Sequence, residues 1–597
     1  MKEFKSQIKE YFSSFFKGFT LEKVVVRLVI AWLFINVLTA VKYGSGFASA
    51  KYAAGINFPM FICFVVLVFI SLSILGKYKI FTWIETYSPM VLITIYGYIT
   101  IEYSGSITYV IGIAVFLAVA IFYAVNKSTK FFDIKRKTTV IVIYAVSALL
   151  FVLYVGSIAV LRYTLYRNPN FDFGIWTQMF YYMKKCFKPL TTCERQNIGL
   201  MSHFKVHFSP IYYLYLPFYM VFPYPVTLNL LQVFTIISGL VPVMLLCKRK
   251  NLSKAATATF GVMFVIFPAI ACGTFYDLHE NCFLLPLILW LFYFLEKDNW
   301  KGTIIFTVLT LLVKEDAAVF CACIGLYAIL GLKRTNKGVI VTALSVSYFI
   351  VVTVFMKYYG LGIMDNRFTN YMVDAANGGL IDVIRNFFTN PAYVIEQCFS
   401  KDKLEFILLM TFPVGFLSFM SKKAAAIILI IPILLENLVS NYQYQHSIFF
   451  QYVYGSCAIL FYLAIVNYAE LSEKTRRFLG SFAICMGIML APVCALSKTY
   501  YFDVYKYDRE RCEVIDEALQ KIPQEASVSA STFFVPHLAN RDYIYEYPYD
   551  KDTDYIVLDM RFSEYSEEEL IKIEDNGYKV IDEEENLYIV YKNINRG

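Results

Sequence analysis

The titratable side chains that could do chemistry in this chain stand in short polar gaps between long apolar runs. They are Asp172, His203, His207, Asp277, His279, Glu280, Lys314, Glu315, Asp316 and His446. Charged groups are costly at membrane depth, so a set of them beside apolar runs indicates a functional site. Carboxylates, imidazoles and a lysine suit acid–base catalysis and the binding of ions.

Asp172 follows directly after an apolar run, within the segment Asn168-Pro-Asn-Phe-Asp-Phe-Gly-Ile-Trp-Thr-Gln178. A carboxylate at a membrane surface could act as a general base on a sugar hydroxyl. The alternative is a cap for a helix that begins near Gly174, because aspartate is a good helix cap. The residues alone favour the cap slightly.

His203 and His207 would share one face of a helix, because they stand four residues apart. That spacing fits metal ligation or contact with a phosphate, and two interfacial histidines are the alternative. A polar cluster between two apolar runs consists of Asp277, His279 and Glu280. We expect this cluster to shape a pocket or to bind a cation.

Lys314, Glu315 and Asp316 stand at the tip of a helical hairpin expected over 303–331. They could neutralise one another, or Lys314 could bind a phosphate. The segment Tyr442-Gln-Tyr-Gln-His446 suits stacking on a sugar or contact with a lipid headgroup, and an interfacial aromatic belt is the alternative. The metal is unknown, and a divalent cation remains open as a cofactor.

The elements that must position these residues are apolar helices. The chain has 597 residues, of which 58% are hydrophobic and 17% are charged, against about 25% charged in soluble proteins. Apolar runs of about 20 residues recur along most of it. This pattern predicts an α-helical polytopic membrane protein with about 13–15 spans.

Basic residues in the short loops predict the orientation, since cytoplasmic loops are rich in Lys and Arg. The groups are 127–137, 248–250, 333–334, 422–423 and 474–477. They share one side if 303–331 is a hairpin. The amino terminus, with an interfacial helix over Met1–Thr20, is then cytoplasmic, and the carboxy-terminal part lies outside the plasma membrane. The proline-rich stretch 208–225 should lie in the interface or re-enter rather than span.

The outer loop 162–210 holds seven basic residues against two acidic ones. We interpret this charge, which includes Arg167 and Arg195, as a site for an anion. An amphipathic segment on anionic headgroups is the alternative. Two cysteine pairs, Cys186 with Cys193 and Cys272 with Cys282, could form disulfides if they face an oxidising compartment.

Three parts are expected. Residues 1–138 form a four-span membrane module, and 139–500 form the membrane core. Residues 501–597 carry 23 acidic and 11 basic side chains and alternate helical and strand patterns. They predict a small extracytoplasmic α/β domain.

Four motifs resemble, in order, a bacterial and archaeal family of predicted multispan membrane proteins of unknown function. They are Phe171-Asp172-x-Gly-Ile-x-x-Gln178, His207-Phe-Ser-Pro210, Asp277-x-His279-Glu280 and Lys314-Glu315-Asp316. The segments Val528–Ala530 and Val535–Leu538, with Arg541 and Tyr547-Pro548, are similar to the family's carboxy-terminal part. The resemblance runs from about residue 139 to the end. At Trp176-Thr177 relatives tend to have Phe-Asp, so a metal site with paired carboxylates is not expected in this loop.

That family looks related to the GT-C glycosyltransferases, and the resemblance implies an inverting transferase that uses a polyprenyl-phosphate-linked sugar at the extracytoplasmic face. A cell-envelope glycan, lipid or protein would be the acceptor, and Asp172 the catalytic base. The implied substrate or phosphate contacts are His207, Lys314, Arg167, Arg195, His446 and Gln178. The implied pocket or cation residues are Asp277, His279, Glu280, His203, Glu315 and Asp316.

Two other classes of function remain open at this point. One is a transporter or flippase of a lipid-linked or anionic solute, which would spread its charged groups through the bilayer depth. The other is a non-catalytic cell-surface assembly factor that binds a partner through its tail. Nothing in the chain indicates a nucleic acid partner.

Overall fold

The protein is described by a computed structural model. It describes residues 20–44, 51–76, 78–104, 106–128, 134–194, 199–362, 365–372, 379–548, 552–562 and 565–596. The interfacial helix expected over Met1–Thr20 lies outside these residues, apart from Thr20, which caps the first described helix.

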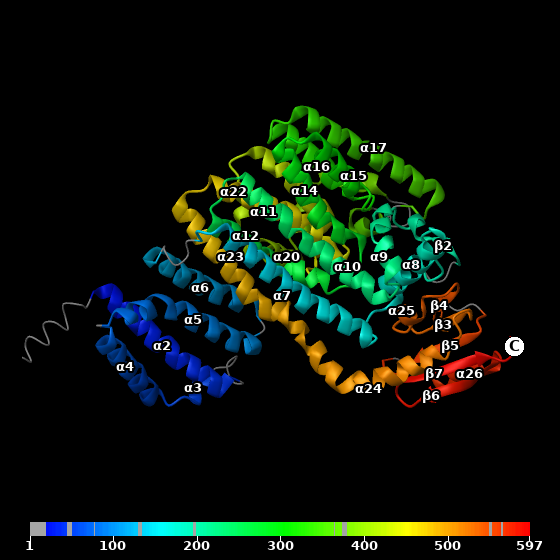
Figure 1. The fold of residues 1–597 in the computed structure, drawn as a ribbon, viewed down its shortest axis with the longest axis horizontal. Helices are drawn as coiled ribbons and strands as arrows, with labels where there is room; N and C mark the ends of the chain where they lie inside the picture. The colour runs from blue at the N-terminus through cyan, green and yellow to red at the C-terminus, as the bar shows by residue number, and fades with distance from the viewer. Residues whose placement is uncertain are drawn as a thin grey trace, which may run out of the picture.

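The amino-terminal part is a separate group of helices at one end of the molecule (Figure 1). Its helices are α2 (Leu21–Tyr43), α3 (Lys51–Ala54), α4 (Phe58–Leu75), α5 (Lys79–Ser104) and α6 (Ile107–Lys127). Helices α5 and α6 pack against α23 of the core. The carboxy-terminal sheet lies at the opposite end of the molecule, far from this group of helices (Figure 1).

The core consists of helices that differ greatly in length. They are α7 (Lys137–Thr164), α8 (Ile175–Cys186), α9 (Leu216–Val221), α10 (Pro225–Ser238), α11 (Leu240–Arg249), α12 (Lys254–Ile266), α13 (Pro268–Thr274), α14 (Leu284–Lys297), α15 (Trp300–Leu311), α16 (Ala317–Leu330), α17 (Thr335–Tyr359), α18 (Leu380–Thr389), α19 (Pro391–Cys398), α20 (Lys401–Thr411), α21 (Ile431–Ile433), α22 (Tyr454–Glu470) and α23 (Glu473–Cys494).

Within the described residues, nine helices are long and apolar enough to cross a membrane. The roughly 13–15 spans expected from the sequence include the apolar runs 282–296, 303–313, 317–331, 404–419 and 424–437. In the structure these five runs correspond to shorter or broken elements. At 1.5 Å per residue, the 12 residues of α15 reach only about 18 Å, well short of a bilayer core of about 30 Å. An apolar run can be buried against other helices as well as against lipid, which is why hydropathy alone predicts too many full-length spans.

Two expectations about the chain path are confirmed. Helices α15 and α16 contact each other as a hairpin, with Lys314, Glu315 and Asp316 between them. The stretch 208–225 holds only a short 3₁₀ turn, Pro210–Leu214, and the six-residue α9. Its prolines interrupt helix formation, so it cannot span a membrane.

The carboxy-terminal part is an α/β unit, as expected from its alternating pattern. It contains α24 (Tyr500–Gln520), β3 (Val528–Ala530), α25 (Val535–Leu538), β4 (Ile544–Glu546), β5 (Tyr555–Asp559), α26 (Glu567–Asp575), β6 (Tyr578–Glu584) and β7 (Tyr588–Asn593). The strand order is β4-β3-β5-β7-β6, with β3 parallel to β4 and β5, and β7 antiparallel to β5 and β6. Helix α24 follows α23 in the chain and contacts α7, and the sheet after it lies near the end of α7 (Figure 1).

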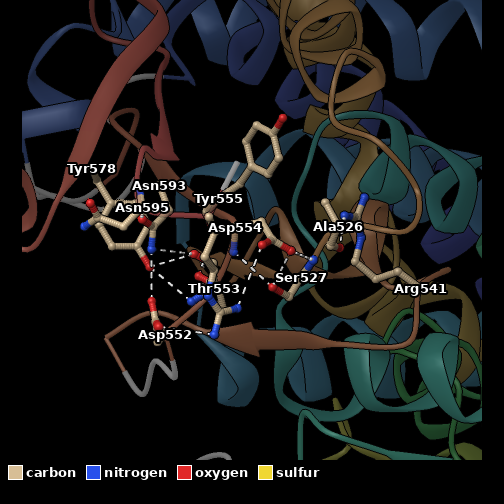
Figure 2. A network of polar contacts seen from close by, with 11 residues as sticks. Ala526, Ser527, Arg541, Asp552, Thr553, Asp554, Tyr555, Tyr578, Asn593 and Asn595 are labelled. Carbon is tan, nitrogen blue, oxygen red and sulfur yellow. Dashed lines mark hydrogen bonds and ion pairs between the residues drawn. The ribbon is translucent and has the colours of Figure 1, made fainter.

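Polar side chains hold the ends of these strands together (Figure 2). The backbone N–H and the hydroxyl of Ser527 both donate to Asp554 Oδ2 at 2.7 Å. Arg541 Nη1 donates to the carbonyl of Ala526 at 2.8 Å, and Asn593 Nδ2 donates to Asp552 Oδ1 at 3.0 Å. These contacts make the sheet a rigid support for the segments that it touches.

Candidate functional site

A cavity of about 790 Å³ brings together five separate segments of the chain. Its lining residues are Phe171, Asp172, Ile175, Trp176, Glu194, His203, Val206, His207, Tyr276, His279, Arg367, Asn441, Tyr442, Gln443, Tyr444, Phe450, Gln451 and Tyr452. Four of the residues singled out from the sequence are among them. The cavity is therefore the candidate site.

Asp172 lies at the cavity on a strained turn just before α8. Its φ of 72° and ψ of −73° fall in the positive-φ γ-turn region, which is rare for a residue with a side chain and costs about 1–3 kcal/mol. The hydroxyl of Tyr276 donates to Asp172 Oδ2 at 2.7 Å. Burial raises the pKa of Asp172 to about 7, against the effect of this hydrogen bond, and the charges of Asp277 and Glu280 add to the rise. Such a carboxyl group is poised to exchange a proton near neutral pH.

The carboxy-terminal unit holds this turn in place. The Asn170 side chain donates to Glu546 at 2.9 Å, and its backbone N–H donates to the hydroxyl of Thr532 at 3.1 Å. A Cβ at Gly174 would lie 2.5 Å from Asn170 Oδ1 and 2.9 Å from Val535 Cγ1. Only glycine allows α8 to begin this close to α25.

Asp277 does not line the cavity but joins two loops beneath it. It is 1% exposed, lies 3.0 Å from Arg162 Nη1, and accepts a hydrogen bond from Asn168. Both loops lead to cavity residues, Asp172 on one side and Tyr276 on the other. Asp277 therefore positions the cavity residues through the backbone and does not itself line the cavity.

Two residues that sequence reasoning missed hold the loop after α13. Asn229 Oδ1 accepts from the backbone of Leu278 at 3.1 Å, and Gln232 Oε1 accepts from the backbone of His279 at 3.0 Å. Both are buried on α10. Two amides three residues apart in an otherwise apolar run were the signal that could have revealed them.

Glu280 is fully buried and serves as the counter-ion of a cluster behind the cavity. It accepts from the hydroxyl of Tyr212 at 2.7 Å, and lies 3.0 Å from His279 Nδ1 and 3.4 Å from Lys314 Nζ. Burial alone would raise the pKa of Glu280, but His279 and Lys314 lower it. Burial would lower the pKa of Lys314, and the charge of Glu280 raises it instead. Glu280 and Lys314 are therefore a charged pair.

His203 and His207 each bond a carboxylate of their own. His203 Nδ1 lies 2.8 Å from Glu194 Oε2, and His207 Nδ1 lies 2.8 Å from Glu315 Oε1. Burial, together with the charge of Lys314, lowers the pKa of His207. The segment forms a 3₁₀ turn rather than the helix expected.

A cation site is not supported by this arrangement. Two of the four carboxylates expected at a pocket or cation site are already paired, Asp277 with Arg162 and Glu280 with Lys314. Across the part of the chain that the structure describes, no group of three His, Cys, Asp or Glu side chains could hold a metal ion.

Arg367 and a set of aromatic rings complete the cavity, and the motifs did not predict them. The guanidinium of Arg367 lies 4.9 Å from the ring centre of Tyr442 and 5.2 Å from that of Tyr452. Nearby, Phe450 packs 4.9 Å from Tyr276 and 4.4 Å from Tyr444, measured between ring centres. Stacked in this way, Arg367 keeps its charge within a largely aromatic wall.

Several predicted site residues lie away from the cavity lining. Gln178 is fully buried, and its amide contacts Thr192 and the backbone carbonyls of 541 and 542, which ties α8 to the sheet unit. Arg167 lies 4.3 Å from the ring centre of Phe562, and His446 is outside the lining. Arg195 lies outside the described residues.

The remaining sequence predictions have the following outcomes. Lys314, Glu315 and Asp316 stand behind the wall, and Lys314 Nζ is 5.9 Å from the ring centre of Tyr452. The thiols of Cys186, Cys193, Cys272 and Cys282 are all free, so neither pair considered as a disulfide is bonded.

Comparison with known proteins confirms the resemblance seen in the motifs. Residues 161–589 match the family described as predicted membrane protein (DUF2079). The crystal structure of ArnT from Cupriavidus metallidurans bound to undecaprenyl phosphate is similar at 12% identity with a TM-score of 0.48, over 77% of this chain and 99% of that one. Neither value is high enough to transfer a site residue or an activity. No curated protein matches the chain.

Proposed function

The chain belongs to the DUF2079 family of predicted membrane proteins, and from this premise we propose that its cavity is the active site of a glycosyltransferase. The sugar donor is a polyprenyl-phosphate-linked sugar, and the acceptor is a cell-envelope glycan, lipid or protein. The protein lies in the plasma membrane with its amino terminus in the cytoplasm. Its cavity and sheet unit face the extracytoplasmic side.

The observation that carries this proposal is Asp172 on its strained turn. Strained backbone persists where the surrounding structure holds it, and it often marks a catalytic residue. The Tyr276 hydroxyl fixes one carboxylate oxygen at 2.7 Å. With a pKa near 7, the carboxylate can accept a proton from an acceptor hydroxyl and release it to water afterwards.

Arg367, which also lines the cavity, suits the phosphate of the donor. Arg367 is held between two tyrosine rings, and its Nη2 donates to the hydroxyl of Tyr452 at 3.2 Å. A guanidinium in such a setting binds phosphate oxygens well, because its charge is permanent and its donors form a planar fork. Lys314, whose Nζ lies 5.9 Å from the ring centre of Tyr452, is already paired with Glu280, so Arg367 is the cation offered to the phosphate.

Further aromatic rings and amides of the lining suit a sugar. Tyr442, Tyr444 and Phe450 offer ring faces, while Asn441 and Gln443 offer amide donors and acceptors. A cavity that is mainly apolar, with a few polar groups, is the usual form of a small-molecule site.

The reaction follows from this placement. The acceptor hydroxyl gives its proton to Asp172 as its oxygen attacks the anomeric carbon, and the bond from that carbon to the phosphate oxygen breaks. The electron pair leaves with the polyprenyl phosphate, whose added charge Arg367 stabilises. The sugar is transferred with inversion at the anomeric carbon.

The test compares Asp172→Asn with a control in sealed vesicles that contain the full chain. Radiolabelled polyprenyl-phosphate sugars are supplied together with an envelope fraction as acceptor. Removal of a general base costs about 10²–10⁴-fold in rate, so Asp172→Asn should lose transfer, while Asp402→Asn on the exposed start of α20 should keep it. Full activity of Asp172→Asn would contradict the role of this carboxylate. Movement of labelled lipid across the bilayer without a new glycosidic bond would favour a flippase instead.

A further inference from the structure

We propose that Trp176 and His203 form a subsite that binds a hydroxyl group of the transferred sugar. This inference rests on the glycosyltransferase function proposed above. It assigns two groups of lining residues, with the sugar at Trp176 and His203 and the phosphate at Arg367.

The first observation is a pair of buried polar atoms without partners. Trp176 and His203 both line the cavity, and each is 1% exposed. Trp176 Nε1 and His203 Nε2 have no hydrogen-bond partner among the residues that the structure describes. Buried polar groups are nearly always bonded, because leaving one unpaired is costly. Two such atoms on one cavity wall indicate a ligand that supplies the missing bonds.

The second observation concerns what these two atoms can do. A carboxylate only accepts hydrogen bonds, so the contact of Glu194 at 2.8 Å places a hydrogen on His203 Nδ1. Nε2 of a neutral imidazole is then an acceptor, whereas the indole N–H of Trp176 is only a donor. A sugar carries hydroxyl groups that both accept and donate, so it can satisfy both atoms, whereas an ionised phosphate oxygen cannot donate to a ring nitrogen.

The third observation is the negative charge beside Trp176 and His203. Glu194 itself lines the cavity behind His203. An anion placed here would face a carboxylate, while the guanidinium of Arg367 lies beside the rings of Tyr442 and Tyr452. The subsite therefore favours the neutral part of a sugar phosphate over its charged part.

Both side chains are held rigidly. The backbone N–H of His203 donates to the carbonyl of Pro189 at 2.8 Å, next to the pairing of β1 (Leu190–Thr191) with β2 (Met201–Ser202). The Trp176 ring packs 4.4 Å from His203 and 5.3 Å from Tyr212, measured between ring centres. Groups fixed in this way discriminate between ligands, because they cannot turn to another partner.

The experiment measures binding of two probes to the full-length protein in detergent. One probe is polyprenyl phosphate, and the other is the same lipid carrying the hexose that the wild type transfers. Trp176→Phe removes the N–H and keeps an aromatic ring. His203→Asn can keep a donor toward Glu194 and removes Nε2. The matched control is Trp290→Phe, which removes an indole N–H beside Phe306 in a separate apolar cavity.

Each subsite variant should weaken binding of the sugar-bearing lipid about 10-fold and that of polyprenyl phosphate less than about 2-fold. The control should change neither. Equal loss for both lipids, or no loss in a Trp176→Phe protein that melts like the wild type, would overturn the subsite while leaving the transferase function intact. A wild type that binds neither lipid would overturn the proposed function, and the subsite with it.

Discussion

Replacing Gly174 with alanine is expected to damage the site without touching any group that takes part in the chemistry. The backbone at Gly174 is helical, with φ of −63° and ψ of −42°, so alanine is conformationally acceptable there. The obstacle is space, because the added Cβ would lie 2.5 Å from Asn170 Oδ1 and 2.9 Å from Val535 Cγ1.

The size of the effect follows from what holds these neighbours. Asn170 is 2% exposed and donates to the Glu546 carboxylate at 2.9 Å, so its side chain cannot turn away without losing that bond. Overpacking costs about 1–3 kcal/mol and loss of a hydrogen bond to a charged group about 1.5–3 kcal/mol, while alanine in place of glycine returns about 1 kcal/mol of helix propensity. We expect a net loss of about 1.5–5 kcal/mol if the contact breaks. If the turn moves instead, a shift of about 1 Å at Asp172 costs about 10²-fold in rate.

The assay pairs thermal unfolding of the detergent-solubilised chain with the vesicle transfer reaction. Gly112→Ala is the control, because a Cβ at this position in α6 meets nothing within 4 Å. That variant should be neutral or slightly stabilised. A Gly174→Ala protein that is as stable and as active as Gly112→Ala would refute the idea that close contact with the carboxy-terminal unit sets the Asp172 turn.

Four further outcomes are expected. Transfer should fall as the pH drops below about 7, where Asp172 becomes protonated, and Tyr276→Phe should move this limb to higher pH in a pH–rate profile, because the lost hydrogen bond had lowered the pKa of Asp172. Since the pKa of Asp172 in the fold lies above its ordinary 3.8, ionisation destabilises the fold, so Asp172→Asn should raise the melting temperature fully above about pH 7 and not at all below about pH 4. Arg162→Met should cost about 3–5 kcal/mol of the free energy of unfolding, because it leaves the buried Asp277 carboxylate without its cation. Adding Asp277→Asn should recover most of this loss, as measured by thermal unfolding. Gln178→Leu should speed limited proteolysis of the carboxy-terminal unit, because its amide contacts with 541 and 542 are lost, and an unchanged cleavage rate would contradict that docking role.

Much of the fold could be predicted because its signals are local. The hairpin of α15 and α16 follows from two apolar runs separated by Lys314, Glu315 and Asp316. The strands of the carboxy-terminal unit follow from short alternating patterns. The number of full-length spans could not be predicted in this way, since a helix such as α14 is buried against neighbouring helices and is too short to cross a bilayer.

The candidate site could be predicted only in part. Asp172, His203, His207 and His279 were singled out as polar residues beside apolar runs, and all four line one cavity. The spacing of residues along the sequence does not show which carboxylate pairs with which lysine or arginine. Asp277 faces Arg162 from a position 115 residues later in the chain, and no local pattern connects them.

The sequence by itself determined that this is a helical membrane protein with an acidic α/β tail, and that a few titratable residues stand between its helices. These properties depend on composition and on patterns within about 20 residues. Only the tertiary structure decided that the tail holds the Asp172 turn, through the bond from Asn170 to Glu546, and that Arg367 faces the same cavity. The physical reason is that such contacts form between surfaces brought together by packing, and helix packing depends on side-chain shape across the whole molecule.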